Sequence, residues 1–253
     1  MKKSEKGLGL YILLFVSMLL LFLFVTGGSV HKLILQADQK QEQQPVIIID
    51  AGHGGEDGGT QGNGLLEKDV NLSIALSLQD LLRARGFQVI MVRTTDSDVA
   101  DHSLKTVSER KKSDLKKRVA LVEEQDNCIL ISIHQNYFEQ QQYCGTQVFY
   151  STQNTGSTEL AQCIQDTVRN SLQADNDRET KPGEGIYLLE QVDVPAVLVE
   201  CGFLSNPDEA AALSEPLYQK QMALCIFSGI CDYISSAYSS KQSVWFEVEE
   251  LPE

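Results

Sequence analysis

The sequence lacks closely spaced cysteines. None of its six cysteines, at positions 128, 144, 163, 201, 225 and 231, belongs to a CxxC pair, so we do not expect cysteine-bound zinc. Six cysteines in 253 residues are also too few for the dense disulfide framework of a small secreted scaffold. We expect most of them to be buried thiols, and the spacing leaves any disulfide pairing open.

Positive charge is scarce as well. The formal net charge is -14 at pH 7, and residues 31–253 carry 18 Lys and Arg against 34 Asp and Glu. A surface this acidic repels the phosphates of nucleic acids and of anionic membranes. We therefore expect no nucleic-acid partner.

Long apolar runs are absent except for one, at residues 8–26, which carries no charge. At about 1.5 Å per residue this run is long enough to cross a bilayer core of about 30 Å. Its length favours an uncleaved membrane anchor within residues 1–30 over a signal peptide, although the small residues at 26–29 leave cleavage open. Lys2, Lys3 and Lys6 precede the run and predict a single-pass protein of the cell membrane with the rest of the chain on the extracytoplasmic side.

After a polar linker at residues 31–45, apolar segments alternate between strand and helix patterns up to residue 236. The alternation predicts one three-layer α/β domain whose mostly parallel or mixed sheet of about six strands is flanked by helices. An acidic tail at 237–253 follows, and polar loops are expected at 94–113 and 174–184. Strands are expected at 46–49, 87–92, 128–133, 145–150, 186–189 and 196–200, and helices at 67–85, 115–124, 157–173 and 206–233, the last interrupted near 215–216.

Four polar side chains follow predicted strands or begin a predicted helix: His53, Glu67, His134 and Glu200. Open α/β sheets bind ligands at the carboxyl ends of their strands. Two imidazoles and one carboxylate are the ligand set of a catalytic zinc that keeps a position open for water, and a further carboxylate suits a general base. The pattern therefore indicates a zinc hydrolase.

Each of these residues also has an ordinary structural explanation. Glu67 suits a helix N-terminus, where a carboxylate gains about 0.3–1 kcal/mol from the dipole, and His134 could be a hydrogen-bonded core histidine. Glu200 is harder to explain in this way, because an unpaired carboxylate directly after the apolar run PAVLV is costly. The four residues form no compact motif, so their spacing alone leaves both interpretations open.

Several segments together resemble a known family. They are IIIDAGHGGEDGG at 47–59 followed by Glu67, ISIHQN at 131–136, and PAVLVECGFLSNPDE at 195–209. In this order they are similar to the zinc-dependent N-acetylmuramoyl-L-alanine amidases of bacterial cell walls, in particular the type 3 amidase catalytic domain. The resemblance implies that His53, Glu67 and His134 hold Zn²⁺ and that Glu200 is the catalytic glutamate. MVRTTD at 91–96 is similar to the family's arginine-containing strand end.

The chain also departs from the family pattern. Gln135 stands where the family usually has a small or apolar residue, and residues 97–113 are longer and more polar than is usual there. We see no long helical insertion between His134 and Glu200 of the kind that plugs the site of division amidases, so self-inhibition of that sort is not expected.

The resemblance implies a hydrolase that cuts the amide between N-acetylmuramic acid and L-alanine in peptidoglycan. A catalytic domain alone behind an anchor is similar in layout to the amidases of spore-forming bacteria that strip stem peptides from the cortex for muramic-δ-lactam formation, which would place it in the forespore intermembrane space. An activating lipoprotein or a deacetylase is then an expected partner. The alternatives are a vegetative cell-wall amidase, a non-catalytic peptidoglycan-binding or regulatory protein with the same fold, and a zinc peptidase acting within the stem peptide.

Overall fold

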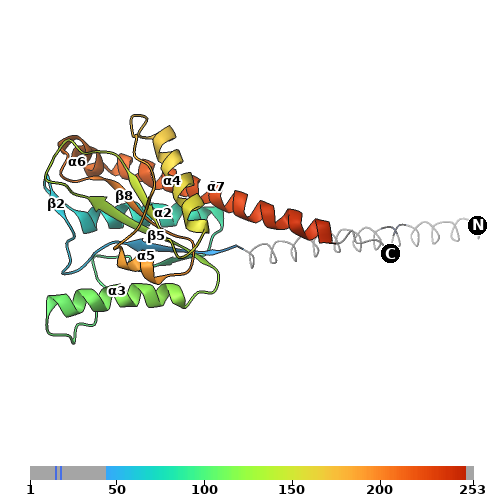
Figure 1. The fold of residues 1–253 in the computed structure, drawn as a ribbon, viewed down its shortest axis with the longest axis horizontal. Coiled ribbons are helices and arrows are strands. Elements are labelled where there is room, and N and C mark those ends of the chain that lie inside the picture. Colours follow the sequence, from blue (N-terminus) through green and yellow to red (C-terminus); the bar gives the residue numbers. More distant parts are fainter. Residues whose placement is uncertain (1–14, 16–17, 19–43, 249–253) are drawn as a thin grey trace, which may run out of the picture. The chain divides into compact units, whose positions relative to one another are not determined.

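A sheet of six strands lies at the centre of the domain that begins at Pro45, in the order β4-β1-β5-β8-β6-β7 (Figure 1). The computed structural model describes residues 15, 18 and 44–248. Strands β1, β4, β5 and β8 are parallel, β6 runs antiparallel to β8, and β7 pairs parallel with β6. The strands are β1 Val46–Ala51, β4 Val89–Met91, β5 Cys128–Asn136, β6 Gln147–Tyr150, β7 Lys181–Pro182 and β8 Ala196–Phe203.

Helices cover both faces of this sheet. Helices α2, α4 and α7 pack on one face, and α3 and α5 lie on the other, as Figure 1 shows. A separate hairpin of two short strands, β2 Gln61–Gly62 and β3 Leu65–Leu66, precedes α2. The helices are α2 Glu67–Arg85, α3 Val107–Glu123, α4 Gly156–Ser171, α5 Tyr187–Gln191, α6 Pro207–Ser214 and α7 Pro216–Val248. This architecture confirms the predicted three-layer α/β fold with a sheet of six strands.

The continuous apolar character of the strands follows from burial on both faces. In β1, Ile47 and Ile49 belong to the core on the side of α2, whereas Ile48 packs on the side of α3. The same alternation in β5 places Ile131 on the first face and Leu130 on the second. All six cysteines are free thiols, and three of them are buried.

The termini of several helices agree with the sequence. Helix α2 ends before Gly86, whose φ of 97° is the left-handed C-cap conformation that glycine adopts without penalty. The break near residues 215–216 separates α6 from α7.

Helix α7 continues as far as Val248, beyond the end predicted at 233. Most of the predicted tail at 237–253 therefore extends this helix.

Three predicted segments were assigned to the wrong structure. Within the loop predicted at 174–184, Lys181–Pro182 form β7, which is the sixth strand of the sheet in place of the strand predicted at 186–189. Residues 107–113, predicted as part of a polar loop, form the first half of α3, which a capping box between Thr106 and Glu109 initiates. The predicted strand at 186–189 is instead largely the short helix α5, because a brief apolar run does not distinguish a strand from a buried helical turn. The corrections at α3 and α5 concern the same face of the sheet.

The predicted anchor at residues 8–26 lies outside the described residues except for positions 15 and 18. Within the part of the chain that the structure describes, no helix has the length and apolar character needed to span a bilayer.

Replacing Thr106 by alanine should lower the free energy of unfolding by about 1 kcal/mol, because Glu109 loses the hydroxyl that accepts its backbone N–H. Urea unfolding followed by circular dichroism measures this change. The control Ser108→Ala lies in the same exposed first turn and should not destabilise the protein. Equal losses in the two variants would contradict the capping role of Thr106.

Candidate active site

The turn after β1 holds the first candidate ligand in an unusual backbone conformation. His53 itself has a φ of 62°, in the left-handed region that side chains rarely adopt, and Gly54 and Gly55 follow with φ of 131° and 56°. Such strain persists where the surrounding structure enforces it, and it concentrates at functional sites. The glycines flanking His53 predicted a permissive turn, and the structure shows that the histidine shares the strain.

Glu67, the first residue of α2, joins the two candidate histidines. Its Oε1 atom lies 2.9 Å from Nδ1 of His134 and 3.3 Å from Nε2 of His53. The two imidazole rings stand edge to face with their centroids 4.9 Å apart. One ligand atom from each of the three residues lies within 4.8 Å of the others, so the predicted group converges and could hold a metal ion.

Hydrogen bonds from several elements fix the Glu67 carboxylate. Oε2 accepts from the backbone N–H of Thr60 at 2.7 Å, and Oε1 accepts from the backbone N–H of Gln135 at 3.1 Å. Asn71, one turn along α2, donates to Oε1 at 3.4 Å and to the carbonyl of Gly52 at 3.1 Å. Gln135 donates in turn to the Asn71 amide oxygen at 3.1 Å, so the residue that departs from the family pattern supports the ligand group.

Asp57 orients the His53 ring. Its Oδ2 accepts from His53 Nδ1 at 2.9 Å, which leaves Nε2 directed toward Glu67. Burial alone would lower the pKa of His53, but hydrogen bonds to Asp57 and Glu67 raise it to about 9. Burial likewise opposes ionisation of Glu67, yet the two histidines hold its pKa well below the usual range. The group therefore favours bound positive charge, whether a proton or a metal ion.

Gly52 leaves room for the second histidine. A Cβ atom at this position would lie 2.2 Å from Nε2 of His134. The first glycine of the turn is therefore required by the close approach of the imidazole.

Two buried arginines hold the carbonyl groups of the same turn. Arg93 donates from Nε to the carbonyl of Ala51 at 2.7 Å and from Nη2 to the carbonyl of Gly52 at 3.0 Å. Arg118, which comes from α3, donates to the carbonyl of His53 at 2.9 Å. The arginine-containing strand end thus contributes Arg93 to the support of the turn, and the sequence reading did not identify Arg118.

Arg118 also neutralises Asp50, a buried carboxylate at the end of β1. The Arg118 guanidinium donates to Oδ1 of Asp50 and, at 2.5 Å, to Asp114, while Ser132 donates to the second oxygen of Asp50 at 2.7 Å. Burial opposes ionisation, but Arg118 and His134 hold the pKa of Asp50 below its usual range. A carboxylate directly after four branched residues was the available signal for this pair.

Glu200 lies beside the ligand group but carries no comparable partner. Its Cα is paired in register with His134 on the neighbouring parallel strand, and both residues fall within their strands rather than after them. Its Oε2 atom is buried without a hydrogen-bond partner among the described residues. Burial raises the pKa of the Glu200 carboxyl to about 7, since the opposing attraction of His134 is partly cancelled by the negative charge of Glu67. A carboxyl with this pKa can both accept and release a proton near neutrality.

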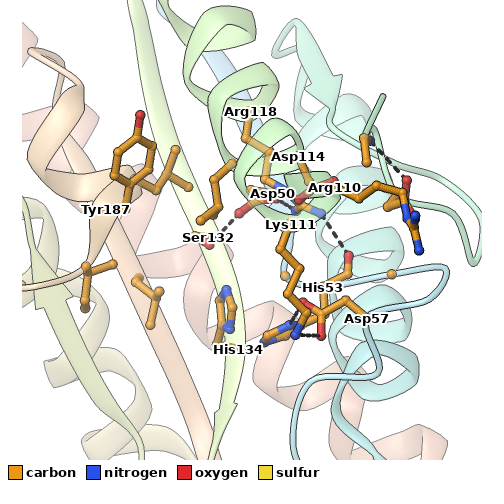
Figure 2. Close-up of a pocket in the computed structure, with 18 of the residues that line it drawn as sticks. Asp50, His53, Asp57, Arg110, Lys111, Asp114, Arg118, Ser132, His134 and Tyr187 are labelled. Carbon is orange, nitrogen blue, oxygen red and sulfur yellow. Dashed lines mark hydrogen bonds and ion pairs between the residues drawn. The ribbon is translucent and has the colours of Figure 1, made fainter. Parts of the chain in front are cut away.

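A cavity of about 310 Å³ opens from His53 and His134 toward α3 and α5. His53 and His134 lie at one end of it, and Tyr187 and Lys111 stand on opposite sides, as Figure 2 shows. The cavity gives a ligand direct access to the histidine pair.

Comparison with protein families and known proteins gives a consistent result. Residues 47–232 match the family described as N-acetylmuramoyl-L-alanine amidase. The chain is 42% identical over 190 residues to the germination-specific N-acetylmuramoyl-L-alanine amidase of Bacillus subtilis (strain 168), covering 75% of this chain and 80% of that protein.

Solved structures extend the likeness to the fold. The CwlD amidase of Clostridioides difficile, solved in complex with the GerS lipoprotein, is 39% identical with a TM-score of 0.74, covering 76% of this chain and 100% of that one. An N-acetylmuramoyl-L-alanine amidase of Clostridium difficile 630 is 31% identical with a TM-score of 0.66, covering 76% and 97%.

Substitution of Arg118 by methionine should lower the free energy of unfolding by about 3–5 kcal/mol, because Asp50 would remain buried without its partner. In a double-mutant cycle, Asp50→Asn should cost much less in the Arg118→Met background than in the wild type. Urea unfolding measures all four proteins, with Lys117→Met on the exposed side of the helix as control. Strict additivity would show that the two side chains are not coupled.

Glu200→Gln should stabilise the metal-free protein increasingly as pH rises. The folded-state pKa of about 7 lies above the ordinary value of 4.5, so the wild type loses stability between these values and the variant does not. The difference in free energy of unfolding between variant and wild type should grow by up to about 3 kcal/mol from pH 5 to pH 8. Chemical unfolding in the presence of a chelator tests this, with Glu139→Gln in an exposed loop as control. A difference that does not change with pH would contradict the raised pKa.

Proposed function

The chain belongs to the N-acetylmuramoyl-L-alanine amidase family, and we propose that it cleaves the amide between N-acetylmuramic acid and L-alanine with a zinc ion held by His53, Glu67 and His134. The observation that carries this proposal is that His53 and His134 both approach one carboxylate oxygen of Glu67. Glu200 is adjacent on the next strand.

The residues present fit a zinc ion. Imidazole nitrogen and carboxylate oxygen atoms are usual ligands of zinc. Three protein ligands leave a fourth position open for water or substrate. Asp57 accepts the Nδ1 proton of His53, which is the usual support of a metal-binding imidazole. When bound, zinc supplies Lewis acidity that polarises a carbonyl oxygen and lowers the pKa of a bound water toward about 7.

Glu200 supplies the proton transfers in this proposal. Its free, buried oxygen is available to take a proton from the attacking water, and its pKa near 7 lets it return that proton to the departing amine of L-alanine. His134, paired with Glu200 in register, keeps the carboxyl next to the metal ligands. The bond broken is the C–N bond of the amide between the lactyl group and L-alanine. Water supplies one oxygen of the new carboxylate and a proton of the new amine.

We further propose that the physiological substrate is spore cortex peptidoglycan, where removal of stem peptides permits muramic-δ-lactam formation. The support is the 42% identity to a germination-specific amidase. The likeness to an amidase solved with a lipoprotein supports a lipoprotein as partner, and a deacetylase acting on the same glycan strand would complete the lactam chemistry. The uncharged run at 8–26, with lysines before it, supports a membrane anchor and an extracytoplasmic catalytic domain.

Digestion of purified peptidoglycan should release intact stem peptides with an L-alanine amino terminus only when zinc is present. Glu200→Gln should retain zinc yet lose about 10²–10⁴-fold in rate, because a general acid–base group contributes that much. His134→Ala should lose zinc, whereas His102→Ala, at an exposed histidine paired with Asp98, should keep both zinc and activity. Mass analysis of fragments and metal content measures these outcomes.

Two results would contradict the assignment. Fragments cut within the stem peptide would indicate a peptidase, and near-normal cleavage by Glu200→Gln would remove its proposed role.

A further inference from the structure

The cavity beside the metal ligands has a wall of uncovered apolar side chains. On α3, Val107 and Leu115 are 53% and 38% exposed although both line the cavity, and Tyr187 of α5, which also lines it, is 36% exposed. Exposed apolar groups gathered around a hollow are typical of ligand sites. This wall is suited to a ligand with small apolar side chains.

Three cations of α3 line the same cavity, and they differ in availability. Arg118 is buried and pairs with Asp50 and Asp114. Arg110 donates twice to Glu56 and also to the carbonyl of Leu104, so its donors are engaged. Lys111 pairs, among the described residues, with Asp57 alone, and its side chain is 53% exposed. An exposed ion pair of this kind contributes about 0.2–1 kcal/mol, so a ligand carboxylate can share or replace it at small cost.

The acidic residues around the cavity are each engaged by a basic side chain. Glu56 pairs with Arg110 and Asp57 with Lys111, Asp114 and Asp50 share Arg118, and Asp98 contacts His102. The exposed ammonium of Lys111 is therefore the group on this wall that is best placed to attract an anion.

Lys111 lies close to the reacting centre. Its ammonium is 2.8 Å from one oxygen of Asp57, whose other oxygen is 2.9 Å from Nδ1 of His53 (Figure 2). A single carboxylate thus separates Lys111 from a metal ligand. Because an extended chain advances about 3.5 Å per residue, a peptide that begins at the scissile amide reaches Lys111 within about two or three residues.

We propose that this cavity binds the stem peptide and that Lys111 recognises the free α-carboxylate of its second residue. The inference rests on the proposed amidase activity and specifies which arm of the substrate lies along α3. The glycan strand offers hydroxyl and acetamido groups, which are neutral. The peptide offers methyl side chains and free carboxylates, because its D-glutamate is joined through the side chain. An apolar wall with one available cation matches the peptide.

Two synthetic muropeptides that differ only at the second residue test this inference, one carrying D-glutamate and the other its α-amide, D-isoglutamine. The zinc-loaded full chain should cleave the acid with a kcat/KM about 5–10-fold higher than the amide, since one charge-assisted contact distinguishes them. In Lys111→Met the ratio should fall to about 1. Lys112→Met, at the neighbouring exposed position outside the cavity, should keep the wild-type ratio.

The ratio separates this inference from the proposed function, because each protein is compared with itself on two substrates. Cleavage of both substrates without discrimination, or discrimination that persists in Lys111→Met, would overturn the role of Lys111. If neither substrate is cleaved, the amidase proposal fails in this assay.

The free dipeptides L-alanyl-D-glutamate and L-alanyl-D-isoglutamine then test the inference independently of turnover. Their binding to the zinc-loaded Glu200→Gln variant is measured by NMR titration. The inference is supported if the acid dipeptide binds more tightly than the amide dipeptide and if this preference disappears when Lys111→Met is added. Equal binding of the two dipeptides, or a preference that survives in the double variant, contradicts it.

Discussion

The Glu67 carboxylate is the constraint on which the arrangement of the site depends. One of its oxygens must lie near imidazoles from two different strand ends, so the turn after β1, the start of α2 and the end of β5 have to meet at one point. The other oxygen is held by the backbone of Thr60. Gly52 clears the space for His134, and His53 adopts a left-handed φ to face inward. The strain of the turn is sustained because Arg93 and Arg118 hold its carbonyl groups.

Two buried carboxylates on the same face of the sheet show how environment assigns roles. Asp50 and Glu200 lie on neighbouring parts of the sheet, yet the pKa of Asp50 is held below its usual range and that of Glu200 is raised to about 7. The difference is the guanidinium of Arg118, which pairs with Asp50 and has no counterpart at Glu200. A paired carboxylate stabilises the fold, whereas an unpaired one beside metal ligands is suited to proton transfer.

The sequence was sufficient to predict the central strands and α2, because each depends on local signals: apolar runs and helical periodicity. Local signals made His53, Glu67, His134 and Glu200 candidates only, and the structure brings the first three together. The first half of α3 was missed for a physical reason. Its one apolar residue, Val107, borders the cavity rather than the core, so the segment has no apolar face. The Asp50 pair was missed because it joins residues 68 positions apart, and no local pattern records such a contact.

Helix α3 therefore links two parts of the site that the sequence presents separately. Its second half is fixed to β1 through the contacts of Arg118 with Asp50 and with the carbonyl of His53. Its first half carries Lys111 and Val107, which line the cavity. Because one rigid element supports the His53 turn and borders the approach to it, a displacement of α3 would change the position of a candidate metal ligand and the shape of the cavity together.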